Sequence, residues 1–167
     1  MVEVIDDVLP LDFIQELNTL PHTNVKHRTN LASWKHQVVG NSGAMLLYDV
    51  ENVLMGKAKN ILSPLFGEEY RNNKWEITYT LGSYFSFIPW HDDGLYPRSM
   101  TIYLNELWDK DWGGYFMYER GQEIIALKPK FNRCVLLHPP VQHTTTMPTM
   151  NAPLRKSLQI FVHEAKQ

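Results

Sequence analysis

Residues 155–163, near the C-terminus, alternate between polar and apolar side chains almost without a break. On an extended strand this alternation separates an apolar face from a polar one: Leu158, Ile160 and Val162 against Arg155, Ser157 and Gln159, with Phe161 as the exception. A buried arginine without a partner is costly, so a polar face that begins with Arg155 implies an anion. Guanidinium binds a carboxylate through two parallel hydrogen bonds, to which the Ser157 hydroxyl adds a third donor. The segment therefore predicts one strand of a barrel whose inside holds a carboxylate.

Strand composition extends through the second half of the chain. Residues 75–88 are dense in Tyr, Phe, Thr and Ile, and Gly82 with Ser83 divides the stretch in two. Turn-forming residues separate further candidate strands, which are 98–105, 114–119, 123–127, 134–137 and 155–164. Many short antiparallel strands after a helical N-terminal part predict an α+β, mainly β fold: a double-stranded β-helix (jelly-roll) core with N-terminal supporting helices.

The predicted helices lie in the first half of the chain. Residues 11–20 are predicted to form a helix that Pro21 ends. Residues 50–65 predict the longer helix, with Val53 on its apolar side and Pro64 near its end. In this fold type such helices cover the outer face of a sheet.

The segment between these helices is polar and has no clear periodicity. Residues 22–41 are rich in His, Asn and Lys, which predicts a loop with one strand near 37–39. Loops beside active sites often grip substrates, so residues 22–45 are a candidate lid.

His91 and Asp93 are candidate metal ligands. Residues i and i+2 of a strand project to the same face, so this spacing aims both side chains at one point while Asp92 points away. A ferrous centre that must hold a chelating co-substrate and oxygen takes three protein ligands, and two imidazoles with one carboxylate are a recurrent set. The pattern therefore predicts an iron site that needs one more histidine.

His143 is the favoured third ligand. It follows the apolar run 134–137, which predicts a strand that returns the chain to the same sheet. His138, which precedes two prolines at the end of that strand, and His163 compete for the role.

Length and composition fit a single domain over residues 1–167, with its β-helix core at about 75–164. A hydrophobic content of 44% with 20% charged residues is ordinary for a folded protein. The net charge of -2 comes from 16 basic and 18 acidic residues without a basic run, so no nucleic-acid partner is expected. No apolar run approaches the roughly 18 to 20 residues that cross a bilayer, so no membrane partner is expected.

The cysteine content and residues 1–7 indicate the cellular compartment in which the protein is expected. Cys134 is the single cysteine, which excludes a disulfide within the chain and predicts a buried strand thiol. Residues 1–7 lack the basic and apolar regions of a signal peptide. A reducing, cytoplasmic location is therefore expected, while the sequence carries no indication of the oligomeric state.

Five blocks of the sequence, in this order, resemble the iron(II)- and 2-oxoglutarate-dependent dioxygenases, and among these the prolyl-4-hydroxylase-like branch. The blocks lie within residues 75–163 and are 90–94 (WHDDG), 100–105 (MTIYLN), 108–114 (WDKDWGG), 131–137 (FNRCVLL), and His143 with 155–157 (RKS). The resemblance favours His143 over the competing histidines, because its spacing to Arg155 is the one that the family shows.

The resemblance implies a catalytic iron(II) held by His91, Asp93 and His143, with 2-oxoglutarate as co-substrate and O2 as oxidant. Arg155 would clamp the far carboxylate of 2-oxoglutarate, and Ser157 would lie beside it. The implied reaction is hydroxylation of an unactivated C–H bond, coupled to oxidative decarboxylation of 2-oxoglutarate to succinate and CO2. A prolyl residue of a peptide or protein is the implied substrate, and a free amino acid or another small molecule is the alternative.

Three tyrosines are candidates for a further contact with 2-oxoglutarate, since a strand tyrosine makes one in many relatives. They are Tyr79 and Tyr84, upstream of the ligand strand, and Tyr103 on the next one. The alternative for each is that it only packs in the core, because aromatic residues in strands are usually buried. Arg98, just beyond Asp93 along the chain, is expected near the substrate mouth, where it either contacts the substrate or is exposed to solvent.

Two functions from other classes use the same residues. A zinc hydrolase would need a general base, for which Asp92 is the one close candidate, and would have no use for Arg155. A non-catalytic, cupin-like binding module would not need a complete ligand set. The presence of Arg155 and of all three ligand candidates favours the oxygenase.

Overall fold

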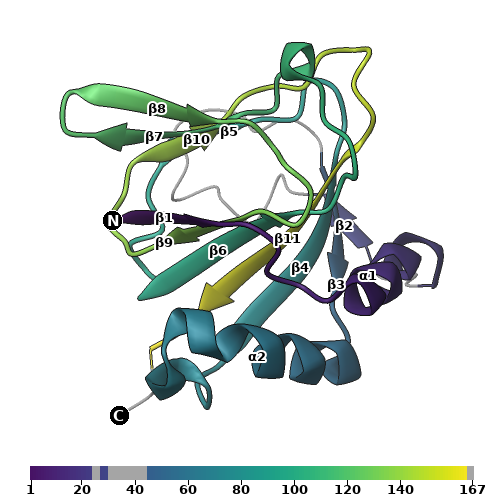
Figure 1. Ribbon diagram of the computed structural model, residues 1–167, viewed down its shortest axis with the longest axis vertical. Helices are drawn as coiled ribbons and strands as arrows, with labels where there is room; N and C mark the ends of the chain where they lie inside the picture. The colour runs from purple at the N-terminus through teal and green to yellow at the C-terminus, as the bar shows by residue number, and fades with distance from the viewer. Residues whose placement is uncertain (24–26, 30–44, 165–167) are drawn as a thin grey trace.

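The structure is a computed structural model that describes residues 1–23, 27–29 and 45–164. Two antiparallel β-sheets face each other across the barrel interior (Figure 1). Within the described residues the larger sheet has seven strands, in the order β1 (Val2–Ile5), β9 (Cys134–Leu137), β6 (Arg98–Tyr103), β11 (Arg155–Val162), β4 (Trp75–Gly82), β3 (Met45–Asp49) and β2 (His27–Thr29). The smaller has four: β5 (Ile88–His91), β10 (His143–Thr145), β7 (Phe116–Arg120) and β8 (Glu123–Leu127). This is the mainly β, two-sheet arrangement that the sequence predicts.

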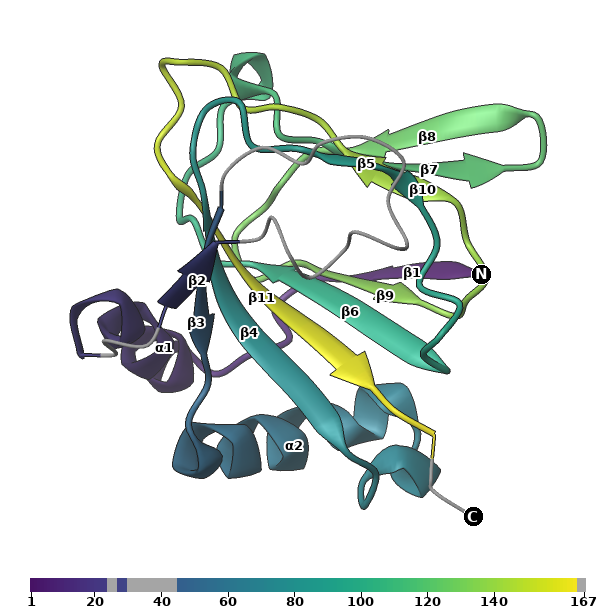
Figure 2. The same cartoon turned by 180° about the vertical axis from the view of Figure 1, so that it is seen from behind.

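In the described part of the chain, both α-helices cover the face of the larger sheet that is turned away from the smaller sheet (Figure 2). They are α1 (Leu11–Thr23) and α2 (Asn52–Phe66), and two short 3-10 turns follow at Glu68–Tyr70 and Lys110–Trp112. Leu17 of α1 and Leu62 of α2 are fully buried against the sheet. Burying side chains of this size contributes about 1.5 to 3 kcal/mol each, so this layer supplies much of the stability of the fold.

The central strands β4, β11 and β6 are paired in a continuous register, and this register decides which side chains face the interior. Leu158 lies between Tyr79 and Ile102, all packed in the apolar layer under the helices. One position along, Ser157 lies between Thr80 and Tyr103 on the opposite, inward face. The alternation predicted for residues 155–163 is therefore present, with its polar side inside the barrel.

Two helix predictions need correction. Pro21 was expected to end its helix, yet α1 runs to Thr23, whereas α2 ends at Phe66, close to the predicted end of 50–65. Each proline lies in the last turn, where the loss of one backbone hydrogen bond is tolerated because the ladder ends there. Val53 was expected on the apolar side of its helix but is 74% exposed.

The exposure of Val53 follows from the orientation of α2. The buried face of the helix is formed by Ala58, Leu62, Ser63 and Phe66, and Val53 in the first turn is rotated away from it. Neither helix in the described part of the chain has the length and apolar character that a bilayer crossing requires. The strand predicted near 37–39 and most of the candidate lid at 22–45 lie outside the described residues.

Candidate metal centre and co-substrate pocket

His91, Asp93 and His143 come together inside the barrel. His91 ends β5, His143 begins the neighbouring β10, and the two residues are directly paired across the sheet. One potential ligand atom from each of the three lies within 4.8 Å of the others, and all three residues are buried. The group can therefore hold one metal ion.

Both imidazoles are oriented by a backbone carbonyl two residues earlier in the chain. The Nδ1 atom of His91 lies 2.8 Å from the Pro89 carbonyl oxygen, and that of His143 lies 2.9 Å from the Val141 carbonyl oxygen. A carbonyl only accepts, so Nδ1 donates and Nε2 is the atom without a proton. Each Nε2 lies 3.7 Å from an oxygen of Asp93. Two nitrogens and one carboxylate thus converge on one point, which is the donor set that suits ferrous iron.

Asp93 differs in one respect from the sequence prediction. The argument from strand alternation placed it on the same strand as His91, but β5 ends at His91 and Asp93 begins the turn that follows. The Ser99 hydroxyl, at the start of β6, donates to Asp93 Oδ2 at 2.6 Å. This bond fixes the carboxylate, and the sequence argument did not identify Ser99.

Burial favours the neutral form of His143. Burial lowers the pKa of His143, and the nearby Asp93 carboxylate only partly offsets that effect. A neutral imidazole has the free electron pair that a metal requires, so burial prepares His143 for coordination.

A contact on the rim joins the two segments that carry the ligands. The Gln142 side chain donates to Asp92 Oδ2 at 3.1 Å, and Asp92 Oδ1 accepts from the Gly94 amide at 2.9 Å. Gln142 and Asp92 are the neighbours of His143 and Asp93 along the chain. The contact therefore ties the His143 strand to the Asp93 turn.

The histidines that competed with His143 lie elsewhere. His138 is 2.6 Å from a Glu3 carboxylate oxygen, and His163 is 3.2 Å from a Glu76 carboxylate oxygen. Neither is in the group around Asp93.

Arg155 lies on the inward face of β11, 4% exposed, and its Nη1 donates to the Gly114 carbonyl at 3.3 Å. Gly82 pairs with it across the sheet, and a Cβ on Gly82 would lie 2.7 Å from the Ser86 hydroxyl and 3.6 Å from Arg155 Nη2. The absence of a side chain at position 82 therefore lets Ser86 approach this strand beside the guanidinium. Burial lowers the pKa of Arg155. A buried guanidinium that pairs with no carboxylate of the described residues is the arrangement expected of an anion site.

Tyr103 faces the same part of the interior as Arg155. It pairs with Ser157 across the sheet and is 2% exposed. Burial raises the pKa of its hydroxyl to about 12, so the group remains a hydrogen-bond donor at neutral pH. The Ser157 hydroxyl is 2.5 Å from the Thr80 hydroxyl, and these two share a hydrogen bond. Thr80 is a neighbour that the sequence argument did not single out.

The structure separates the other two tyrosine candidates from this pocket. Tyr79 packs on the outer face of β4, and its hydroxyl donates to Asn18 of α1 at 3.0 Å. Tyr84 lies in the turn after β4, 50% exposed and in edge contact with Phe85. The prediction of a co-substrate contact is wrong for Tyr79, which faces the helices, and for Tyr84, whose ring lies in a solvent-exposed turn.

Arg98 was expected near the substrate mouth, and this expectation is wrong. Its guanidinium lies over the ring of Tyr70, 5.1 Å from the centroid, and donates to the Pro97 carbonyl at 2.7 Å. On β6 it shares the outer face with Met100 and Ile102, on the side opposite the metal ligands. Strand alternation therefore turns Arg98 away from the interior.

A cavity of about 20 Å³ lies between the ligands and the larger sheet. Its wall opposite the ligands is formed by Ser99, Thr101, Gln159 and Phe161. Phe161 packs against Tyr96 with 4.7 Å between ring centroids, so this wall of the polar interior is aromatic. The break in alternation at Phe161 is the sequence signal that could have marked this wall.

The comparisons with known proteins agree with this geometry. A sequence model of the 2OG-Fe(II) oxygenase superfamily matches residues 78–163, which is more than half of the chain. The chain belongs to this superfamily. Its members use iron(II), 2-oxoglutarate and O2, so the dioxygenase chemistry and the cofactors expected from the sequence are confirmed.

Solved structures support the fold of this oxygenase. A prolyl-4-hydroxylase from Pseudomonas putida superposes with a TM-score of 0.70 at 17% identity, covering 98% of this chain and 92% of that one. A prolyl hydroxylase from Trichoplax adhaerens, in complex with a peptide fragment of the hypoxia inducible factor oxygen degradation domain, gives 0.75 at 13% identity, with 97% and 83% covered. A 2OG-Fe(II) oxygenase family oxidoreductase from Burkholderia pseudomallei gives 0.72 at 13% identity, with 97% and 85% covered. The jelly-roll fold is thereby confirmed, while comparison with curated protein sequences gives no match.

Proposed function

We propose that His91, Asp93 and His143 are the iron ligands of this oxygenase and that Arg155 with Tyr103 binds the far carboxylate of 2-oxoglutarate. The observation that carries the proposal is the convergence of three buried ligand atoms within 4.8 Å on the inside of a barrel. The same interior contains the buried guanidinium of Arg155. Arg155 and Gln159 lie on the same face of β11, and Gln159 lines the cavity at the ligands, so the guanidinium and the metal site share one side of the sheet.

When bound, iron(II) and 2-oxoglutarate supply oxidative decarboxylation to succinate and CO2, coupled to hydroxylation of a C–H bond. The residues of the chain position and shield this chemistry. Carbonyl contacts at Nδ1 present the Nε2 atoms of His91 and His143, and Ser99 holds Asp93. Ser157, paired with Thr80, is proposed to line the pocket beside Arg155. No separate general base is needed.

We further propose that the substrate is a residue of a peptide or protein, and a prolyl residue in particular. Two relatives in fold are prolyl hydroxylases, and one of them is seen with a peptide. The aromatic pair of Phe161 and Tyr96 offers an apolar wall, which suits a pyrrolidine ring better than a charged metabolite. A free amino acid or another small molecule remains the alternative that the substrate test decides.

The proposal extends to the domain and the cellular compartment of the enzyme. We expect one oxygenase domain over residues 1–167, acting in a reducing, cytoplasmic compartment. The buried thiol of Cys134 and the need to keep iron ferrous support such a compartment.

The test is anaerobic addition of iron(II) and 2-oxoglutarate, followed by visible absorption spectroscopy. Chelation of ferrous iron by 2-oxoglutarate is expected to produce a charge-transfer band, and oxygen is then expected to release succinate. A zinc hydrolase or a metal-free binding module would give neither signal. A protein that binds iron without the band would contradict the assignment of Arg155 and Tyr103. Candidate substrates are compared by the succinate that each adds, with prolyl peptides against free proline.

A further inference from the structure

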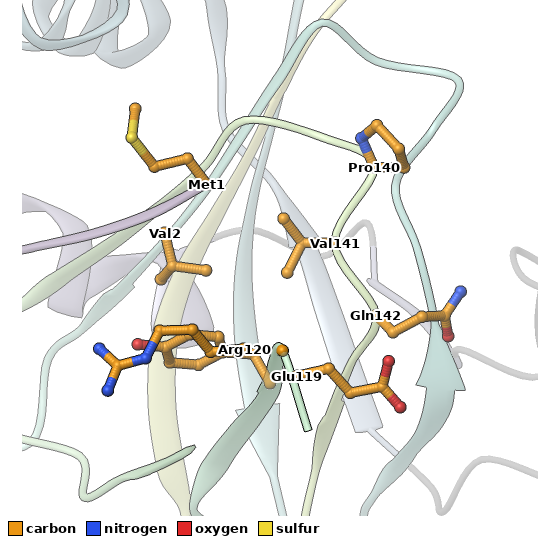
Figure 3. Close-up of a pocket in the computed structure, with 9 residues that line it drawn as sticks. Met1, Val2, Glu119, Arg120, Pro140, Val141 and Gln142 are labelled. Atoms are coloured by element: carbon orange, nitrogen blue, oxygen red, sulfur yellow. The ribbon is translucent and has the colours of Figure 1, made fainter. Parts of the chain in front are cut away.

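A second cavity, of about 600 Å³, opens between the start of β1 and the end of β7 (Figure 3). It is lined by the start of β1, the end of β7, the turn that follows β7, and the segment that leads into β10: Met1, Val2, Tyr118, Glu119, Arg120, Gly121, Pro140, Val141 and Gln142. A volume of this size is typical of ligand pockets in proteins. The cavity of about 20 Å³ at the metal is far smaller, so the body of a substrate needs space of this kind outside the ligand cluster.

The cavity is continuous with the segments that carry the ligands. Tyr118 pairs with His143 across the sheet, and the Glu119 amide donates to the Gln142 carbonyl at 3.0 Å. The Gln142 side chain in turn reaches Asp92, the neighbour of Asp93. One side of the cavity is therefore formed by residues adjacent to the metal ligands.

Strand register places the cavity at the metal end of the barrel. Val2 pairs with Leu137, and Leu137 pairs on its other side with Ser99, the residue that holds Asp93. Arg155 lies at the other end of the interior, where it pairs with Gly82. The cavity is thus on the substrate side of the centre and not on the side proposed for 2-oxoglutarate.

The charges around the cavity are unequal. Figure 3 shows the Glu119 carboxylate on the Gln142 side and the Arg120 guanidinium on the Val2 side. Arg120 has a carboxylate partner, Glu123, at 3.9 Å. In the part of the chain that the structure describes, no basic side chain pairs with Glu119, and Asp92 adds a second negative charge nearby. The Gln142 side of the cavity therefore presents an uncompensated carboxylate to whatever enters.

We propose that this cavity binds the part of a peptide substrate that flanks the oxidised residue, and that it selects a basic side chain to pair with Glu119. The inference rests on the proposed peptide-hydroxylase function and adds a charge preference to it. The apolar groups between the two charges, Val2 and Val141, would contact the aliphatic part of that lysine or arginine.

Two fluorescein-labelled peptides test the proposal by fluorescence anisotropy, with iron(II) and 2-oxoglutarate bound and oxygen excluded. Both have a central proline, and one is flanked by lysines while the other is flanked by glutamates. The lysine peptide is expected to bind more tightly by about three- to fivefold, the size of one exposed ion pair. Glu119→Lys is expected to reverse this order. Glu106→Lys is the matched control, because Glu106 is exposed beyond the Tyr103 end of β6, far from the cavity, and it should leave the order unchanged.

A steric variant gives a second readout. Val2→Trp places an indole in the cavity and is expected to weaken binding of the lysine peptide by about tenfold, since it excludes ligand from apolar surface. Ile124→Trp makes a similar change on β8 at a residue that is 56% exposed and does not line the cavity, and should have no effect. Equal binding of both peptides, or a preference that Glu119→Lys does not alter, would overturn the proposal. The charge-transfer band, recorded on the same samples, reports separately on the proposed oxygenase function.

Discussion

The two faces of the central strands β4, β11 and β6 are both largely buried but chemically opposite. On the outer face Ile160 is completely buried among apolar neighbours under the helices. On the inner face Arg155, on the same strand, is 4% exposed, and among the described residues its side chain makes one hydrogen bond. Burial of apolar surface stabilises the fold, whereas burial of a charge costs stability unless a ligand completes it. The inner face is therefore suited to binding a ligand, and the outer face stabilises the fold.

The largest expected effect is a loss of activity when a proposed metal ligand inside the barrel is removed. His143→Ala should reduce hydroxylation on the order of 1,000-fold, because one of three bonds to the metal is lost. The free energy of unfolding of the metal-free protein should change by about 1 kcal/mol or less. Metal affinity, succinate release and denaturant unfolding together measure the outcome.

The counterpart on the outer face is Ile160→Ala. It should lower the free energy of unfolding by about 2 to 5 kcal/mol through the cavity it leaves, while the folded fraction keeps its affinity for iron. If His143→Ala retained full metal affinity, the proposed ligand set would be wrong. If Ile160→Ala abolished metal binding in protein that is still folded, the separation of the faces would be wrong.

The next largest effect comes from the buried charge. Arg155→Met should raise the KM for 2-oxoglutarate by about 100-fold, because a charge-assisted contact to carboxylate is lost. The same change should leave the free energy of unfolding equal or raise it by about 1 to 4 kcal/mol, since an apolar side chain of similar volume avoids desolvation of the guanidinium.

Arg155→Lys sharpens this result. It keeps the charge but not the planar two-bond fork, so its KM should fall between those of the parent protein and Arg155→Met. A large loss of stability in Arg155→Met without a change in KM would assign Arg155 a structural role.

Two tyrosines offer a matched pair across the same sheet. Burial raises the pKa of both Tyr79 and Tyr103 to about 12. Tyr103→Phe should raise the KM for 2-oxoglutarate by about tenfold, because a donor to a carboxylate is lost. Tyr79→Phe should leave that KM unchanged and cost about 1 kcal/mol of stability, through loss of the bond to Asn18.

Alkaline unfolding is the control for this pair. A pKa raised in the folded state contributes stability that is present below the unfolded value near 10 and is lost as the pH rises toward 12, and this holds for both residues alike. The pH dependence of unfolding should therefore not distinguish them. A rise in KM for Tyr79→Phe as large as that for Tyr103→Phe would contradict the assignment of the faces.

Strand alternation was sufficient to predict much of the interior. It placed Arg155, Ser157 and Gln159 on one face, and the same rule applied to residues 75–81 would have grouped Tyr79 with Trp75, Ile77 and Leu81 on the apolar face. Arg98 shares its parity with Met100 and Ile102 in the same way. The sequence predictions for Tyr79 and Arg98 were therefore wrong because they gave closeness to the ligands along the chain more weight than the alternation of side chains along a strand.

Other parts of the site depend on contacts that no local pattern contains. Ser99 reaches Asp93 because the turn between β5 and β6 folds back on itself. The pairing of Gln142 with Asp92 joins segments 50 residues apart and requires β10 to lie beside β5. Local periodicity predicts which face a side chain takes, and it does not predict which distant strand lies next to it.

The smallest predicted effect concerns the contact between Gln142 and Asp92 on the rim, which lies at neither buried face of the larger sheet. Gln142→Leu should weaken cobalt(II) binding about three- to tenfold, less than the loss of a typical buried contact to a ligand, because this hydrogen bond is exposed. Visible absorption of the cobalt(II) protein, recorded without peptide, measures this affinity and also the geometry of the ligands. Gln122→Leu on the exposed β7–β8 turn is the matched control and should change neither. If both variants bound cobalt(II) as the parent protein does, the two ligand-bearing segments would be fixed by sheet pairing alone, and positioning of the metal would belong entirely to the buried interior.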